Sequence, residues 1–532
     1  MATPIGVNAQ DATATATKPP DRTSWASQPK YKPDELLVRF RPGTTPEKRS
    51  IAHSAVKAEQ VKSWPSVDGL QLVRVSAGVS IQDAIKLYRQ RAEVLYAEPN
   101  YYLHAFTTPN DAKFPQLWGL QNTGQLTGTA GADIHAAQAW SITTGSSNVV
   151  VAVIDTGMDY THQDLAANAW SSTAPYSVTV NGTTINCPVG SHGFNAVSNS
   201  CDPMDDNGHG THVSGTIGAA GNNGVGVAGV NWSVRIMPCK FLDSSGGGTT
   251  DAAVTCLDFV KSMKDAGEKI VATNNSWGGG GFSQALFDTI QAQQQDGVLF
   301  IAAAGNDSSN TDLGGFYPGG YFLPNIVSVA ATTRFDLLAN FSNIGSHSVT
   351  LGAPGQEILS TFPNNSYAWL NGTSMATPHV TGVAALLAAQ DPSRDWRAIK
   401  NLLIAGGDTI PALSETISGK RLNAYGSMTC SNSTVARRLQ PTLDTIVGSV
   451  GTPILLSALN INCAQPVGPV TVNVVPGNQT INLADNGTNP DQAAQDGIYT
   501  GQWTPPGIGN YKLTFSTGES MQVTVLNNYV GG

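Results

Sequence analysis

The stretch Val149-Val150-Val151-Ala152-Val153-Ile154 is an uninterrupted run of six apolar residues. A strand without polar alternation is typical of a parallel sheet that helices cover on both faces. Similar runs recur at residues 235–237, 270–272, 298–303 and 326–330. The intervals between them accommodate helices, which we expect at residues 251–266 and 283–296. This alternation predicts an α/β domain with a doubly wound parallel sheet, in which ligands bind at the carboxyl ends of the strands.

The sequence changes character before this domain. Residues 1–30 are rich in Ala, Thr, Pro, Ser and Asp and are expected to form a disordered leader. Strand and helix patterns then alternate over residues 31–106, which predicts a small α+β domain with a split βαβ unit. Its expected elements are strands at residues 36–40, 70–75 and 94–96 and helices at residues 46–61 and 80–91, the second capped by Ser80.

The α/β domain is expected to span residues 107–429, because helical periodicity ends at about residue 430. Short alternating runs separated by Gly, Pro and Asn turns follow at residues 470–475, 511–515 and 521–526. They predict a third, all-β domain over residues 430–532, with the architecture of a β-sandwich.

Charge is unevenly distributed along the chain. Residues 1–107 contain 14 Lys and Arg against 10 Asp and Glu, whereas residues 108–532 contain 15 against 28, and together they give the net charge of −9. The difference has two explanations: independent domains of different composition, or a basic segment that docks on the acidic remainder. The negative total argues against a nucleic-acid partner, and no apolar run of about 18 residues predicts a membrane span.

The six cysteines occur without a CxxC motif, which gives no support to a zinc site. Six cysteines allow about 15 disulfide connectivities. We favour pairing between neighbours, because each pair brackets a short segment rich in Gly, Ser or Asn: Cys187 with Cys201, Cys239 with Cys256, and Cys430 with Cys463. Disulfides indicate an oxidising compartment, so we expect a secreted protein. Residues 1–20 lack the features of a signal peptide, so either export uses another route or, as we favour, the signal precedes the printed sequence.

Three separate motifs carry candidate chemistry. Asp155 follows the first apolar run, His209 lies in Gly208-His209-Gly210-Thr211-His212, and Ser374 lies in Gly372-Thr373-Ser374-Met375 before an apolar helix. Taken singly, they have simpler explanations: a turn cap, half of a metal-binding histidine pair, and a helix N-cap. Taken together, the order Asp, His, Ser is one of the known orders of a catalytic triad. Over residues 108–428 these motifs resemble those of the subtilases, the subtilisin-like serine proteases.

The chemistry of a serine nucleophile gives each residue a role. A hydroxyl needs a base at neutral pH, so His209 is expected to take the proton of Ser374 and return it to the leaving amine. Asp155 is expected to orient His209 and stabilise its charged form. Asn306, in Ala302-Ala303-Ala304-Gly305-Asn306, resembles the subtilase oxyanion donor, and the Ser374 N–H is the expected second donor.

The resemblance also implies a substrate cleft and a propeptide. The substrate-binding residues would be Ser276, Trp277, Gly278, Gly246, Gly247, Gly248, Asp307 and Phe316. Bulky Phe316 is expected to shorten the pocket for the residue before the scissile bond, and Asp307 to tolerate a basic one. Residues 31–105 resemble inhibitory propeptides, with residues 96–100 as the tail that enters the cleft. We expect this intramolecular inhibitor to be cut off between about residues 105 and 110.

The resemblance further implies structural Ca²⁺, held by Asp164, Asn223, Val225 and Val227, and no organic cofactor. A second oxygen site is an alternative explanation of the acidic turns at Asp485, Asn486, Asp491 and Asp496. We expect a monomer that hydrolyses peptide bonds in protein or peptide substrates. Two rivals remain: an esterase or polyester depolymerase using the same acyl chemistry, and an inactive scaffold whose last domain binds glycan, cell wall or protein.

Overall fold

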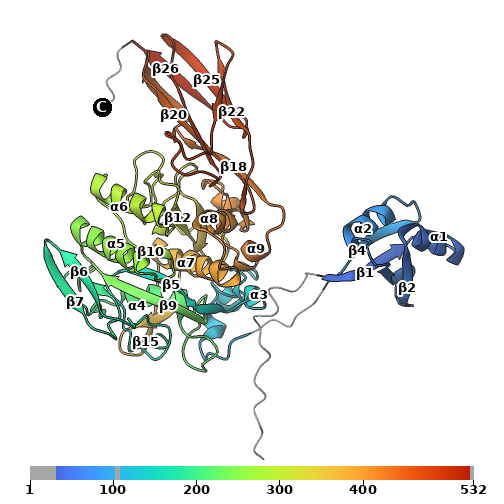
Figure 1. Cartoon of the computed structure of the whole chain (residues 1–532), viewed down its shortest axis with the longest axis horizontal. Coiled ribbons are helices and arrows are strands. Elements are labelled where there is room, and N and C mark those ends of the chain that lie inside the picture. Colours follow the sequence, from blue (N-terminus) through green and yellow to red (C-terminus); the bar gives the residue numbers. More distant parts are fainter. Residues whose placement is uncertain (1–30, 102–107, 528–532) are drawn as a thin grey trace, which may run out of the picture. The chain divides into compact units, whose positions relative to one another are not determined.

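A computed structural model describes residues 31–101 and 108–527 (Figure 1). The expected leader at residues 1–30, and part of the expected processing region, lie outside the described residues. The described chain forms two compact units, residues 31–101 and residues 108–527. In neither of them is any helix long and apolar enough to cross a lipid bilayer.

The first unit is an antiparallel sheet with two helices, in the strand order β2-β3-β1-β4. Its elements are β1 (Tyr31–Phe40), α1 (Pro46–Val56), β2 (Ala58–Ser63), β3 (Leu70–Val75), α2 (Ile81–Arg89) and β4 (Val94–Tyr101). Its core contains Leu36, Val38, Ile85 and Tyr88, all buried. This is the expected split βαβ arrangement with one strand more than predicted.

The predicted helix at residues 46–61 is wrong in its last five residues. Helix α1 ends at Val56, because Lys57 adopts a left-handed conformation with φ 54° and its N–H donates to the carbonyls of His53 and Ser54. The following residues form edge strand β2.

The second unit is built on a nine-stranded sheet in the order β16-β17-β13-β12-β11-β10-β5-β9-β8. The strands from β13 to β8 pair in parallel: β5 (Gly145–Asp155), β8 (Phe194–Asn195), β9 (Ser233–Lys240), β10 (Ile270–Asn275), β11 (Leu299–Ala303), β12 (Ile326–Thr332) and β13 (Leu351–Pro354). An antiparallel pair, β16 (Asp408–Thr409) and β17 (Lys420–Arg421), completes one edge.

Residues of β5 alternate between two hydrophobic cores. Val151 and Val153 belong to the core that contains residues of helices α4 (His209–Gly218) and α7 (Thr373–Gln390). Val150, Ala152 and Ile154 belong to the core of helices α5 (Thr250–Asp265) and α6 (Gln284–Gln295). The sheet is therefore buried on both faces, and the predicted doubly wound fold is confirmed (Figure 1).

The remaining elements surround this core. They are α3 (Ala136–Ala139), β6 (Tyr176–Val180), β7 (Thr183–Cys187), β14 (Ile358–Phe362), β15 (Ser366–Leu370), α8 (Trp396–Ala405) and α9 (Ala424–Thr429). Strands β6 and β7 form a hairpin, and so do β14 and β15.

A two-sheet β-domain follows α9, as expected. One sheet contains β18 (Thr434–Gln440), β20 (Ile454–Asn462), β21 (Gln465–Pro466) and β24 (Ile498–Trp503); the other contains β19 (Thr445–Ser449), β22 (Val470–Val475), β23 (Gln479–Leu483), β25 (Gly509–Phe515) and β26 (Ser520–Leu526). The two sheets enclose a core that includes Leu456, Val472, Trp503 and Leu513.

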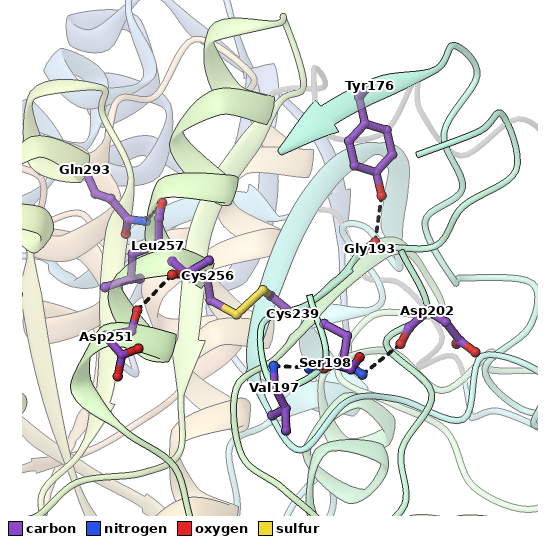
Figure 2. The surroundings of a disulfide bond; sticks show 12 residues. Tyr176, Gly193, Val197, Ser198, Asp202, Cys239, Asp251, Cys256, Leu257 and Gln293 are labelled. Carbon is purple, nitrogen blue, oxygen red and sulfur yellow. Dashed lines mark hydrogen bonds between the residues drawn. A yellow bond between two sulfur atoms is a disulfide. The ribbon is translucent and has the colours of Figure 1, made fainter. Parts of the chain in front are cut away.

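Three disulfides form, in the neighbouring pairs that we favoured: Cys187–Cys201, Cys239–Cys256 and Cys430–Cys463. The second joins the end of β9 to helix α5 (Figure 2). Between its two cysteines lies the loop that contains Gly246, Gly247 and Gly248. This disulfide therefore ties both ends of a glycine-rich loop to the sheet and its covering helix.

Candidate active site

Asp155 is the last residue of β5 and is completely buried. Its Oδ1 lies 2.8 Å from Nδ1 of His209 and accepts a hydrogen bond from the N–H of Thr156 at 2.7 Å. Because a buried carboxylate is costly without a partner, this contact fixes both the position and the tautomer of the imidazole.

His209 begins helix α4, and the two glycines beside it are required by packing within the protein. A Cβ atom on Gly208, where φ is 110°, would lie 2.4 Å from the ring of Phe362. A Cβ atom on Gly210 would lie 2.0 Å from the carbonyl oxygen of Gly157. These close approaches lock the start of α4 against the loop after β5, which brings His209 to Asp155.

Opposing effects act on the pKa of His209. Burial lowers the pKa, whereas the Asp155 carboxylate raises it through its charge and its hydrogen bond, with a smaller contribution from Asp205. The net result is a pKa above the ordinary value of 6.5. An imidazole held in this way is suited to accept a proton.

The second histidine of the motif has a structural environment. His212 is completely buried, and its Nε2 lies 3.1 Å from the carbonyl oxygens of both Ile358 and Ala368. Burial lowers its pKa to about 3, so this ring stays neutral. The alternative of a metal-binding histidine pair has no support in this geometry.

Ser374 lies in the first turn of α7, at the carboxyl edge of the sheet. Its Oγ donates to the carbonyl of Ser276 at 3.0 Å, and the Ser276 hydroxyl donates to the Ser374 carbonyl at 2.9 Å. Among the described residues its hydroxyl makes no hydrogen bond to His209, although both residues line the same cavity.

Asn306 and the start of α7 are joined by hydrogen bonds. The Asn306 Oδ1 accepts from the N–H of Thr373 at 2.9 Å and from its hydroxyl at 3.0 Å. A Cβ atom placed on Gly372 would lie 3.6 Å from Asn306 Nδ2 and 3.5 Å from the Ser374 backbone nitrogen. Two donors thus border one small space beside the nucleophile, which is the arrangement that an oxyanion needs.

A cavity of about 740 Å³ contains these groups. It is lined by His209, Ser374 and Asn306 and by seven of the eight expected substrate-binding residues: Ser276, Trp277, Gly278, Gly246, Gly247, Gly248 and Phe316. Asp307 is not in the lining; it is exposed, and its N–H donates to Asn343 at 2.9 Å. The expected influence of Asp307 on a basic substrate side chain therefore has no support in the cavity.

Comparison with known proteins agrees with this geometry. The family model described as "Subtilase family" matches residues 146–422, about half of the chain. The chain belongs to the subtilase family. A second model, described as "Fervidolysin N-terminal prodomain", matches residues 17–100, so this subtilase carries a prodomain.

Relatives of this subtilase are named as proteases. The chain is 34% identical to a thermophilic serine proteinase of Bacillus sp. (strain AK1) over 75% of this chain and 88% of that protein. It is 35% identical to thermitase of Thermoactinomyces vulgaris, over 60% and 98% respectively. It is also 35% identical to an extracellular protease of Xanthomonas campestris pv. campestris, over 66% and 62%. A solved structure of a protease from Pseudoalteromonas arctica matches 60% of this chain and 99% of its own with 28% identity and a TM-score of 0.50.

Sequence reasoning missed a buried lysine in this subtilase. Lys240 pairs with Asp155 in the β5–β9 register, and its Nζ donates to the carbonyls of Thr156 and Leu242 at 2.9 and 2.8 Å and to Asp206 at 2.6 Å. It thereby joins the loop that follows Asp155 to the wall of the cleft. Its position at the carboxyl end of the buried strand β9 was the available signal.

The loop expected to hold calcium in this subtilase lies beside two buried carboxylates. Asp164 accepts from the Asn223 amide and the Val227 N–H, each at 2.9 Å. The nearby Asp111 has a buried Oδ1 without a donor among the described residues, and its pKa is raised by burial and, to a smaller extent, by the charge of Asp164. Two buried carboxylates fit a hard cation. However, Asn223 and Val227, which were expected to supply oxygen ligands, instead donate N–H groups to Asp164. In the described parts of the chain, no three His, Cys, Asp or Glu side chains form a metal-binding group.

Proposed function

We propose that this subtilase is a secreted serine endopeptidase zymogen, with Ser374 as nucleophile, His209 as base and acid, and Asp155 orienting His209. The observation that carries the proposal is the contact of 2.8 Å between Asp155 and His209 in the same cavity as Ser374. The extracellular relative and the disulfides support secretion.

The proposed reaction begins with a rotation of the Ser374 side chain from the Ser276 carbonyl toward His209 Nε2. His209 takes the hydroxyl proton as Oγ attacks the substrate carbonyl, and Asp155 stabilises the imidazolium. Asn306 Nδ2 and the Ser374 N–H then receive the oxyanion, each worth about 3–4 kcal/mol in the barrier. His209 returns the proton to the leaving amine, and water hydrolyses the acyl-enzyme by the reverse sequence.

We propose that the cleft selects a small residue before the scissile bond. The Phe316 ring lies between two glycines: a Cβ on Gly278 would be 2.3 Å from it, and a Cβ on Gly305 would be 3.0 Å from it. Its ring therefore occupies space beside Asn306 that a substrate side chain would otherwise enter. The glycine-rich walls leave room for an extended peptide backbone to bind as an added strand.

The prodomain would act as an intramolecular inhibitor that the enzyme removes between about residues 105 and 110. Residues 1–107 contain 14 Lys and Arg against 10 Asp and Glu, whereas residues 108–532 contain 15 against 28. These opposite net charges support docking of the basic section on the acidic one. Purified Ser374→Ala protein should keep its prodomain, and a prodomain already cleaved in that variant would exclude self-processing.

Calcium is proposed as a structural ion at Asp164, with Asp111 as a second carboxylate and Asn223, Val225 and Val227 as the expected neighbours. The ion would neutralise two buried carboxylates and hold the loop at residues 221–227. Chelation should lower the thermal stability of the enzyme, with recovery on adding Ca²⁺ but not Mg²⁺.

One experiment tests the function as a whole: labelling with a fluorophosphonate probe, followed by cleavage profiling on a peptide library. We expect Ser374 to be labelled and peptide bonds to be cut by the wild type but not by Ser374→Ala. Absence of labelling would favour the inactive scaffold. A higher kcat/KM for matched esters than for peptides would favour the esterase.

A further inference from the structure

A groove of about 840 Å³ lies at the opposite end of helix α7 from Ser374. Ala388 and Ala389 at the end of α7 line it, together with residues at the amino ends of β5 and β10 and the loop 487–494 of the β-sandwich. Ser374 and Ala388 are 14 residues apart, which corresponds to roughly 21 Å along a helix. The groove is therefore separate from the catalytic cleft.

The groove combines an apolar floor with a basic rim. Its floor includes Val271, Trp396 and Ala493. Of the 15 Lys and Arg residues in the acidic section 108–532, four line this groove: Lys264, Lys269, Arg394 and Arg397. Its two acidic residues are already paired, Asp296 with Lys261 and Asp395 with Arg397. The groove is thus complementary to an anion attached to an apolar group.

Two cations on the rim are available to such an anion. Lys269 is exposed, and its ammonium has no hydrogen bond or ion pair within residues 31–101 and 108–527. Arg394 donates to two neutral acceptors, the Leu387 carbonyl and the Gln390 side chain, and its ion pair with Asp391 is long, at 3.8 Å.

A third feature identifies the class of ligand. Gln294 lines the groove and is 7% exposed, and its Oε1 has no donor among the described residues. A buried carbonyl oxygen requires an N–H or O–H partner. A peptide supplies main-chain N–H groups, whereas a fatty acid has none.

We propose that this groove binds the carboxyl-terminal end of a peptide. Its apolar side chains rest on the floor, the Gln294 side chain rotates to bring its Oε1 to a main-chain N–H, and the terminal carboxylate meets Lys269 and Arg394. The origin of such ends rests on the proposed function, because each hydrolysis creates a new carboxyl terminus. The binding itself does not depend on catalysis.

The test uses the full chain with Ser374→Ala, titrated calorimetrically with acetyl-Ala-Leu-Ala-Leu as the free acid and as the amide. We expect the acid to bind about tenfold more tightly than the amide, because a charge-assisted contact is lost in the amide. Lys269→Glu should abolish this difference, while Lys512→Gln, an exposed lysine of β25, should not change it. Arg394→Gln should also weaken binding, but this substitution removes the internal hydrogen bonds of Arg394. Lys269→Glu removes no internal contact and therefore gives the cleaner result.

A benzophenone version of the peptide locates the site, and cross-links are expected at residues 264–271 or 388–397. Equal affinity for acid and amide, or an unchanged difference in Lys269→Glu, overturns the proposal. Cross-links confined to the catalytic cleft also overturn it. If decanoate binds in a Lys269-dependent manner and the peptide does not, the groove is a lipid site and the proposal is wrong. Because the inactive variant is used, failure here is distinct from failure of the proposed protease function.

Discussion

His209 Nδ1 lies 2.8 Å from Asp155 Oδ1, at the point where the buried carboxyl end of β5 meets the first turn of α4. The carboxylate is completely buried and the imidazole is half-buried, so the pair shares a site with little water to weaken it. This one contact both selects the tautomer of His209 and raises its pKa.

Replacing Asp155 by Asn should lower kcat by about 10⁴-fold, the loss that follows when the tautomer is no longer fixed. The pH profile supplies a second readout. Only neutral His209 acts as a base, and its pKa is above 6.5, so wild-type kcat/KM should rise with a midpoint above pH 6.5. Without the carboxylate, the midpoint of the residual activity should shift to lower pH. An unchanged midpoint would contradict the assignment of Asp155.

Phe316→Gly should enlarge the pocket beside Asn306. Because the ring lies against Gly278 and Gly305, its removal leaves space for a large side chain. We expect kcat/KM for substrates with Phe before the scissile bond to rise by about tenfold or more, at roughly 25 cal/mol for each Å² of apolar surface newly buried. Substrates with Ala at that position should change little. Leu313→Gly, an exposed residue outside the cleft lining, serves as the matched control. Equal effects on both substrates would show that Phe316 does not limit the pocket.

The catalytic motifs could be recognised from the sequence because each lies at the end of a helix or strand with a clear apolar pattern. Strand β2 was missed because nearly all of its residues are exposed, so no alternation of apolar and polar residues marks it. The role of Lys400 was missed for another reason: its partner, Asp496, is far along the chain in another domain. Long-range pairs of this kind leave no periodic signal. The acidic turn at Asp496, considered for a metal, instead has the Lys400 ammonium 3.5 Å from its carboxylate.

Lys400→Met should destabilise the junction between α8 and the β-sandwich. Both side chains are almost completely buried, at 2% and 1% exposed, so the variant leaves a buried carboxylate without its cation. The free energy of unfolding should fall by about 3–5 kcal/mol. Replacing both residues, as Lys400→Met with Asp496→Leu, should recover most of this stability. The rate of irreversible thermal inactivation measures both effects, with exposed Lys512→Met as the control. A single variant as stable as the wild type would show that the ion pair contributes nothing.

The stability of the prodomain unit should fall as the pH falls below about 6.5, because of His53. This ring is buried, with Nδ1 2.8 Å from the Tyr88 hydroxyl and Nε2 2.9 Å from Gln71 Oε1. Burial lowers its pKa from 6.5, a Gln71 hydrogen bond opposes this, and the charge of Arg49 lowers it further. Above pH 6.5 both the folded and unfolded states hold a neutral ring, so the full stability is present. As the pH falls from 6.5 toward the folded pKa, only the unfolded state gains a proton, and stability is lost.

Hydrogen exchange of the peptide covering β3 measures this effect in full-length Ser374→Ala protein, after correction for the intrinsic exchange rate. Protection should decrease as the pH falls below about 6.5 in the parent protein and stay constant in His53→Gln, which has no titrating group at that site. His135→Gln is the matched control, since His135 lies in the other unit and its pKa is raised, chiefly by its hydrogen bond to Asp408. If His53→Gln keeps the full pH dependence, the loss of protection has another origin, and the buried histidine does not set the acid stability of the prodomain.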